Sequence, residues 1–291
     1  MTTRNCSNDT DNKATAGCRI GRRNSNQAVC TGVLGAILIG GLYNSRAEAT
    51  ERRFTYTYES NVLNPGEFEL EPWTTFRAGR DGFYNRLDHR LEFEFGLVDR
   101  LQTAWYLNFS AVAKNEGTER VSEFEWQGVS WEWKYKVLDS VADPIGLGLY
   151  FEPALGPTEA EVEFKLILDK RIGNFYTAFN AVYEYEWNFE KQGETVREQV
   201  LEFDLGLTYF ITPNFSAGIE ARNHNEFPEG KDWEHSALFL GPVVSYSTRK
   251  WWATLTVLAQ LPALKKNDSG STFILDEHER LNARLLFGVH F

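Results

Sequence analysis

Residues 280–291 read RLNARLLFGVHF, and their side chains alternate between apolar and polar types. Odd-numbered positions hold Leu, Ala, Val and Phe, whereas even-numbered positions hold Arg, Asn, Gly and His, with Leu286 as the exception. Successive side chains of a β-strand point to opposite sides of the sheet. The stretch therefore predicts a strand with one apolar and one polar face, and the apolar face ends on an aromatic residue, Phe291.

The N-terminal region has the features of a secretory signal peptide. An apolar run at residues 28–43 follows several arginines and is too short to span a bilayer as a helix. An Ala-x-Ala cleavage site ending at Ala49 comes after the run. These features predict a signal peptide over residues 1–49. The glycines in the run and the cleavage site disfavour the alternative, a membrane anchor or an amphipathic helix.

The composition of the remaining chain excludes several classes of protein. Residues 1–49 hold six Lys/Arg and three Asp/Glu, so 24 basic and 38 acidic residues remain, a net charge of −14. Such an acidic chain without basic clusters is a poor binder of nucleic acid. Cys6, Cys18 and Cys30 are removed with the signal peptide, so no disulfide or thiol chemistry is expected. No apolar run of about 18 residues remains for a spanning helix.

Amphipathic segments of about ten to fourteen residues recur along the chain, as tilted membrane strands require. We predict twelve such strands, at residues 66–78, 86–97, 100–113, 121–137, 144–153, 160–170, 174–187, 197–210, 214–224, 234–247, 250–262 and 279–291. Tight turns alternate with longer polar loops between them, which is typical of bacterial barrels. Residues 50–65 are predicted to be a periplasmic lead-in or an extra strand, with an inner plug as a further alternative.

Two segments depart from simple alternation. In residues 121–137, polar side chains occupy odd positions before Gly128 and even positions after it. A β-bulge near Gly128-Val129 would keep all of them on one face, so we predict a bulge there. Residues 234–247 show no clear alternation, and the sequence assigns neither of their faces.

Alternation alone does not show which face points inward, because soluble sandwiches and lipocalin-like barrels alternate too. The signal peptide, Phe291 and aromatic residues near strand ends favour a membrane protein. The aromatic residues expected at the membrane interfaces are Trp73, Trp105, Trp126, Trp131, Trp133, Tyr183, Tyr185, Trp187, Tyr209, Trp251 and Trp252. We therefore predict an all-β fold at residues 66–291, a transmembrane antiparallel up-and-down β-barrel of about 12 strands. It is expected in the outer membrane of a Gram-negative cell, in contact with lipid and lipopolysaccharide.

Parts of the chain resemble known barrels. The closing strand resembles that of bacterial outer-membrane β-barrels, in which the terminal aromatic is read by the barrel-insertion machinery; this resemblance implies the same role for Phe291 and the machinery as a partner. Residues 63–71 (LNPGEFELE), 91–97 (LEFEFGL) and 101–104 (LQTA) look like a broad group of uncharacterised, transporter-like proteobacterial outer-membrane barrels, related in pattern to the barrel of aromatic-degradation operons. The resemblance implies the fold, the location and a transport role, and it carries over no catalytic residue.

With the apolar faces toward lipid, densely ionic faces line the lumen. Fourteen acids and eight bases are predicted to be pore-lining: Glu67, Glu69, Glu71, Arg86, Asp88, Arg90, Glu92, Glu94, Glu132, Lys134, Lys136, Glu161, Glu163, Lys165, Glu184, Glu186, Glu202, Asp204, Glu220, Arg222, Arg280 and Arg284. Either these groups pair across the lumen and fill it, or a water-filled path remains whose acidic excess favours cations. We predict a narrow, cation-leaning channel for passive diffusion of small solutes.

Two other functions compete with the channel. An outer-membrane lipid-modifying hydrolase could use a Ser/His pair on the outer wall. His89 lies on an apolar face at a suitable depth, but the sequence shows no Gly-x-Ser-x-Gly motif and no serine tied to His89, so we assign no catalytic residue. A non-conducting structural or surface-interaction barrel is the third possibility.

Histidines and carboxylates gather near three predicted outer loops. The clusters are Asp276-Glu277-His278-Glu279, Asp232-x-Glu234-His235 and His224-x-Glu226. They have the residue types that bind divalent ions, but they match no known ligand spacing. We expect solvated loop charges here, and we predict no metal and no cofactor. The oligomeric state is not predicted.

Overall fold

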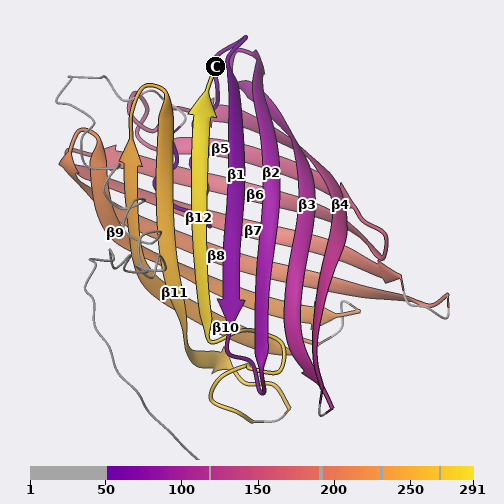
Figure 1. Cartoon of the computed structure of the whole chain (residues 1–291). Helices are drawn as coiled ribbons and strands as arrows, with labels where there is room; N and C mark the ends of the chain where they lie inside the picture. The colour runs from indigo at the N-terminus through magenta and orange to yellow at the C-terminus, as the bar shows by residue number, and fades with distance from the viewer. Residues whose placement is uncertain (1–50, 118, 190–192, 230–231, 269) are drawn as a thin grey trace, which may run out of the picture. The chain divides into compact units, whose positions relative to one another are not determined.

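The computed structural model describes residues 51–291 apart from residues 118, 190–192, 230–231 and 269. The predicted signal peptide at residues 1–49 therefore lies outside the described residues. Twelve antiparallel strands of the described chain form one closed ring, in which each strand pairs with its neighbours in the sequence. Pairing of β1 (Phe68–Ala78) with β12 (Leu281–His290) closes the ring, and these two strands lie side by side in Figure 1. Within the described residues, no helix is long and apolar enough to cross a membrane.

The ten strands between β1 and β12 follow the predicted order. They are β2 (Tyr84–Val98), β3 (Leu101–Glu116), β4 (Glu119–Leu138), β5 (Gly146–Leu155), β6 (Glu159–Ile172), β7 (Phe175–Phe189), β8 (Thr195–Thr212), β9 (Phe215–Pro228), β10 (His235–Ser247) and β11 (Trp251–Lys265). Each predicted segment corresponds to one observed strand. The predicted 12-stranded antiparallel up-and-down barrel is therefore confirmed.

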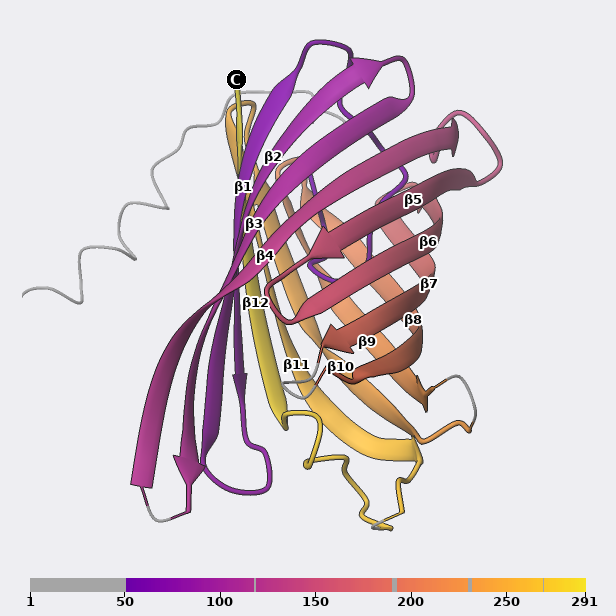
Figure 2. The same cartoon turned by 90° about the vertical axis from the view of Figure 1, so that its right-hand side faces the viewer.

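The β3–β4 hairpin is longer than the sequence predicted. Residues 114–120 were expected to form a polar loop, but Asn115 pairs with Arg120 and Glu116 with Glu119. The turn is thereby reduced to two residues, and Gly117 takes a φ of 63°, which a residue without Cβ adopts most easily. Figure 2 shows this hairpin extending beyond the rest of the ring. Its tip is polar because it projects past the apolar part of the wall.

The predicted β-bulge is present in β4. Asn108 pairs with Gly128, but the next residue, Phe109, pairs with Trp126, so Gln127 has no residue opposite it. Gly128 has a φ of 116°, and a Cβ there would lie 2.1 Å from the carbonyl oxygen of Leu155. The bulge explains the change of phase in the sequence, because one extra residue returns the following side chains to the inward face.

The apolar face of the wall points outward. Phe93, Leu205 and Leu285 are exposed on the outside, whereas Glu92 and Glu94 beside Phe93 are buried inside the ring. A soluble barrel has the opposite arrangement, with its apolar side chains inside. An apolar exterior around a closed ring is the form that a lipid bilayer requires. The fold is therefore that of a transmembrane barrel.

Two of the predicted interfacial aromatics are not on this exterior. Trp73 and Trp252 are 3% and 0% exposed and point into the ring, so their assignment to the membrane interface is wrong. Trp105 and Trp126 are exposed as predicted. Phe291 is exposed too, and its backbone N–H donates to the carbonyl of Phe68 at the closure of the ring (3.0 Å). Its role as an insertion signal stays a prediction.

Residues 51–63, which we call the inner segment, form no strand and are almost completely buried. Figure 2 shows the indigo trace that precedes β1 turning back among the strands of the ring. Phe54, Tyr56 and Tyr58 each belong to one of three buried clusters, together with inward-facing wall residues. Of the three interpretations of residues 50–65, the contacts of residues 51–63 therefore agree with the inner plug and not with a further strand.

The inner segment also explains the places where alternation failed. Leu286 is fully buried and belongs to the same cluster as Tyr58. In β10, Phe239 clusters with Tyr56, and Val243 clusters with Phe54. Inward positions of the wall are thus apolar where an aromatic ring of the inner segment packs against them, and β10 consequently has apolar residues on both faces.

Candidate functional site in the barrel interior

A carboxylate of the wall binds the backbone of the inner segment. Glu220 on β9 is completely buried and accepts backbone N–H bonds from Tyr56 (2.8 Å) and Thr57 (2.7 Å) through one oxygen. Its other oxygen accepts bonds from the Thr55 N–H (3.2 Å) and from the Thr256 hydroxyl (2.6 Å). Hydrogen bonds to an ionised acceptor are about twice as strong as neutral ones. Glu220 therefore fixes this part of the chain against the wall.

Two further wall residues hold the segment farther along. The side-chain amide of Asn180 on β7 accepts the N–H of Tyr58 (2.5 Å) and donates to the Tyr58 carbonyl (3.0 Å). It thereby satisfies both polar backbone groups of Tyr58, as a neighbouring strand would. Asp169 on β6 accepts the N–H of Ser60 (2.9 Å) and the Ser60 hydroxyl (2.7 Å).

The segment crosses the interior from one wall to the opposite wall. Near its end, the N–H of Leu63 donates to the side chain of Gln102 on β3 (2.9 Å). We call Glu220, Asn180, Asp169 and Gln102 the anchoring residues. They lie on β9, β7, β6 and β3, and β9 and β3 are half a ring apart in the strand order. The inner segment therefore restricts the lumen across its width.

Cations surround the aromatic rings of the segment. The guanidinium of Arg52 lies 4.0 Å from the centre of the Tyr58 ring, and the ammonium of Lys165 lies 4.2 Å from it. Arg284 on β12 stacks on Tyr56 at 3.8 Å. A desolvated cation over an aromatic ring contributes about 2 kcal/mol. Basic residues of the lumen thus hold the inner segment, in addition to the carboxylates of the wall that bind its backbone.

Many acids and bases of the wall also pair with each other. Arg222 contacts Glu202 (2.6 Å), and Arg90 contacts Glu152 (2.5 Å). Lys165 contacts its neighbour on the same face, Glu163 (2.8 Å). Such pairs agree with the first of the two interpretations of the lumen, in which acids and bases pair with each other and fill it.

Carboxylates nevertheless gather in groups on the inward face. Three groups have ligand oxygens within 4.8 Å of one another: Glu69, Glu71 and Glu94; Glu92, Glu94 and Glu132; and Glu161, Glu163 and Glu184. The first two groups are fully buried. Coulomb repulsion between carboxylates at this spacing is large unless cations are close. The interior therefore combines ion pairs with local concentrations of negative charge.

Most predicted pore-lining residues lie on the inward face of a strand. These are Glu69, Glu71, Arg86, Asp88, Arg90, Glu92, Glu94, Glu132, Lys134, Lys136, Glu161, Glu163, Lys165, Glu184, Glu186, Glu202, Asp204, Glu220, Arg222 and Arg284. Whether they line a pore stays a prediction.

Glu67 and Arg280 lie just before β1 and β12 and not within a strand, and their placement in the lumen stays a prediction. Glu67 precedes β1, is exposed, and accepts the N–H of Asn64 (2.9 Å). Arg280 precedes β12, is exposed, and lies 3.5 Å from the centre of the Phe273 ring. Both residues extend the polar alternation by one position before the first residue of a strand. The sequence pattern therefore does not distinguish them from residues within the strand.

The prediction missed three of the four anchoring residues. Asp169 has the same parity as Glu161 and Glu163, and Asn180 has the same parity as Glu184. A candidate list that included the uncharged residues and the strand-end residues of each inward face would have contained both. Their partners in the inner segment could not be found, because the two parts are far apart in the sequence.

The loop between β11 and β12 folds onto the barrel interior. Ile274 is fully buried in the cluster of Tyr56, and its N–H and carbonyl both bind the side-chain amide of Gln260 (2.9 and 3.0 Å). Arg80 pairs with Glu279 (2.7 Å). Burial lowers the pKa of His278 in this loop to about 4. The end of the loop is therefore an ordered part of the structure.

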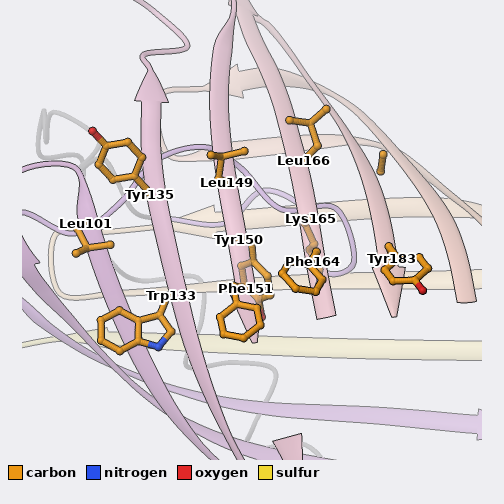
Figure 3. A pocket seen from close by; sticks show the side chains of 11 residues that line it. Leu101, Trp133, Tyr135, Leu149, Tyr150, Phe151, Phe164, Lys165, Leu166 and Tyr183 are labelled. Carbon is orange, nitrogen blue, oxygen red and sulfur yellow. The ribbon is translucent and has the colours of Figure 1, made fainter. Parts of the chain in front are cut away.

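The outer wall carries one apolar recess, shown in Figure 3. Its lining includes Trp133, Phe151 and Phe164, which belong to the outward alternation of β4, β5 and β6. The surface of its lining is almost entirely apolar. We interpret it as a part of the lipid-facing surface.

A closed ring with an apolar exterior and an ionic interior defines a β-barrel of the outer-membrane type. Residues 46–291 match a family described as a family of unknown function (DUF6662), and the chain belongs to this family. A search of curated proteins found no match. The predicted relation to the barrel of aromatic-degradation operons stays a prediction.

Solved barrels are similar to this chain at low identity. NanC porin is 13% identical with a TM-score of 0.47, over 76% of this chain and 98% of that one. KdgM porin is 9% identical with a TM-score of 0.43, over 77% and 99%. The β domain of the Bordetella autotransporter BrkA is 12% identical with a TM-score of 0.45, over 78% and 100%.

Proposed function

We propose that this protein lies in the outer membrane of a Gram-negative cell and forms a narrow channel for small solutes, with a preference for cations. The observation that carries the proposal is the grouping of carboxylates on the inward face, such as Glu92, Glu94 and Glu132. Rings of carboxylates select cations in channels because they replace part of the hydration shell and repel anions. The closed, ionic interior supports a path for ions more than a binding site for an apolar ligand.

In this proposal the inner segment sets the size of the path. Its backbone is fixed at both walls by the anchoring residues, and its aromatic rings fill the space between them. A solute must pass beside this segment or displace it. We therefore expect the protein to conduct less than a 12-stranded barrel with an empty lumen.

Planar-bilayer recordings of the purified protein test the proposal. Under a KCl gradient, we expect small openings whose reversal potential shows a preference for K⁺ over Cl⁻. Replacement of both Glu92 and Glu94 by Gln is expected to reduce this preference, because it removes two inward carboxylates. The control is Glu123→Gln, at an exposed position of the extended β4, which is expected to leave selectivity unchanged. Silence of all proteins, or a preference for anions, would contradict the proposal.

One specific observation favours the second candidate function, a lipid-modifying hydrolase. On the outward face, the hydroxyl of Thr74 lies 2.9 Å from Nδ1 of His89. A histidine at this distance is able to accept a hydroxyl proton, so Thr74 would take the role that a serine has in a Ser/His pair. The test is fatty-acid release from phospholipid vesicles that contain the protein. Release that Thr74→Ala and His89→Ala both abolish would support an enzyme, and no release by the unchanged protein would exclude this candidate.

A further inference from the structure

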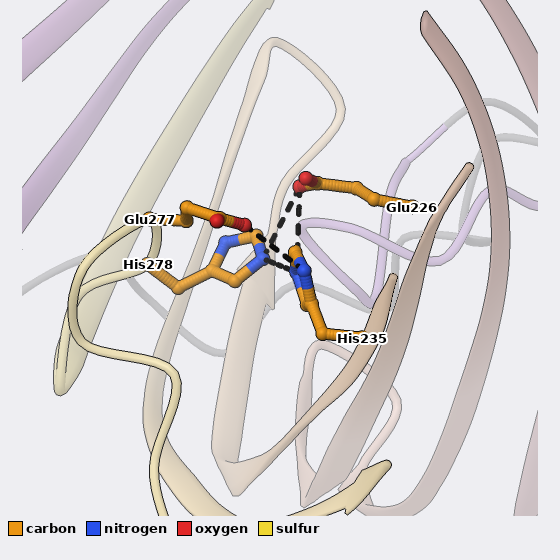
Figure 4. Close-up of side chains that lie close together, drawn as sticks. All are labelled: Glu226, His235, Glu277 and His278. Carbon is orange, nitrogen blue, oxygen red and sulfur yellow. Dashed lines mark hydrogen bonds and ion pairs between the residues drawn. The ribbon is translucent and has the colours of Figure 1, made fainter. Parts of the chain in front are cut away.

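Four side chains from three separate parts of the chain meet at one end of the barrel, as Figure 4 shows. Glu226 on β9 and His235 on β10 are directly paired across the two strands. Glu277 and His278 come from the ordered loop before β12. His235 is completely buried, and His278 is nearly so. These residues were expected to be solvated loop charges, but the fold buries the two histidines and brings all four side chains together.

Three ligand atoms of this group point toward one another. Nε2 of His235 and Nε2 of His278 are 2.8 Å apart. Oε1 of Glu226 lies 3.3 Å from Nε2 of His278 and 3.6 Å from Nε2 of His235. A tetrahedral zinc ion with bonds of about 2.0–2.1 Å holds neighbouring ligand atoms about 3.3 Å apart. The observed sides of 2.8, 3.3 and 3.6 Å lie around this spacing, so the two imidazoles need to separate only slightly for three ligands to share one such ion.

Glu277 lies against the second ring nitrogen of His235. Its Oε2 lies 2.9 Å from Nδ1 of His235, within ion-pair distance. Nε2 of the same ring faces His278 and Glu226. A carboxylate behind a histidine ligand is the usual partner of such ligands in metal sites.

A second layer supports Glu226 in the same way. Nε2 of His224 lies 2.9 Å from Oε1 of Glu226, and Nδ1 of His224 lies 2.7 Å from Glu202. The carboxylate of Glu226 is thus oriented before any ion arrives. Because the site is formed by buried side chains on two paired strands and an anchored loop, it needs little rearrangement to bind.

We propose that Glu226, His235 and His278 bind one zinc-type divalent transition-metal ion, with Glu277 orienting His235. Two imidazoles and one carboxylate suit Zn²⁺ and its first-row neighbours, whereas Mg²⁺ and Ca²⁺ prefer oxygen ligands alone. A water molecule completes the coordination. The bound ion joins the loop before β12 to β9 and β10 on the inward side of the wall. This inference is independent of conduction.

The test is zinc binding by the full-length protein after treatment with a chelator. Isothermal titration with ZnCl₂ is expected to show one ion per chain. His278→Ala is expected to weaken binding more than about 100-fold, and Glu277→Gln about 10–100-fold, the loss that follows removal of an orienting carboxylate. The matched control is His290→Ala, which removes a histidine of another strand and is expected to leave the affinity unchanged.

A spectroscopic readout separates ligation from folding defects. Co²⁺ in place of Zn²⁺ is expected to give the visible absorption of a four-coordinate site, and His278→Ala is expected to remove it. His278 lies in a loop, so the variant should keep the heat-modifiable mobility of a folded barrel. No zinc uptake, or equal uptake by the unchanged protein and His278→Ala, would overturn the proposal and leave a hydrogen-bonded histidine pair.

Discussion

The outer and inner faces of the barrel wall both carry large aromatic side chains, but they use them differently. On the outside, Trp105 and Trp131 stack on each other at 4.6 Å, and the indole N–H of Trp131 donates to the hydroxyl of Thr103 (2.7 Å). Inside, Trp73 lies beside Tyr58 of the inner segment, and the guanidinium of Arg52 lies over both rings. The outer aromatics belong to the lipid-facing surface, whereas the inner ones form a packed core between the wall and the inner segment.

The wall and the interior of the barrel therefore depend on different kinds of signal in the sequence. The wall depends on a local pattern, since each strand needs only alternation and a turn. The interior depends on contacts between residues that are up to 229 positions apart, such as Thr55 and Arg284. The interior can therefore be changed while the wall is kept, and the following experiments use this difference.

The largest effect is expected from loss of Glu220. In Glu220→Ala, three backbone N–H groups of the inner segment lose their acceptor, and each unpaired buried group costs about 1–3 kcal/mol. We expect the segment to leave the wall and the conductance to rise several-fold, while the barrel stays folded. Single-channel recording and protease cleavage within residues 51–63 measure the two effects. The matched control is the outward neighbour Ile219→Ala. Unchanged conductance together with unchanged protection of the segment would show that Glu220 does not hold it.

A smaller effect, on stability, is expected from shortening either of two neighbouring leucines to alanine. Leu286 is 0% exposed and packs inside, whereas Leu285 is 46% exposed on the outside. Leu286→Ala is expected to destabilise the protein by about 2–5 kcal/mol, because it leaves a cavity in a packed core. Leu285→Ala is expected to cost clearly less, because lipid fills the space. Urea unfolding of both variants in lipid vesicles gives the difference, and equal losses would contradict an inner core at this position.

The sequence could predict the wall but not its contents. The alternation in residues 280–291 identified the last strand, and the change of phase at Gly128 located the bulge within one residue. In contrast, Leu286 was an unexplained exception until Tyr58 was found beside it. The metal-ligating group was missed for the same reason, since His235 and His278 are 43 positions apart and match no local motif.

The smallest effect concerns a turn outside the membrane. Asp139, between β4 and β5, accepts the backbone N–H groups of Val141 (2.9 Å) and Ala142 (3.0 Å), which lower its pKa. The ionised form is thus favoured in the folded state, so its stabilisation is complete above the unfolded pKa and is lost as the pH falls through the lower folded pKa. Asp139→Ala is expected to cost at most about 1 kcal/mol at neutral pH, because solvent screens the turn. Unfolding curves should show the loss at pH 7 and a smaller one near pH 3; an equal loss at both values would contradict this account.

The most direct test of the account is a disulfide between the inner segment and the wall. A Cβ at Gly148 on β5 would lie 3.5 Å from Cβ of Ser60, within the range of about 3.5–4.5 Å that a disulfide needs. The double variant Ser60→Cys, Gly148→Cys is made in protein without Cys6, Cys18 and Cys30. We predict that the bond forms on oxidation, shifts the mobility of the unfolded protein in non-reducing gels, and leaves the conductance at the same low value in the oxidised and the reduced protein. Two thiols that stay free and react fully with an alkylating reagent in the folded protein would contradict the presence of the segment in the lumen.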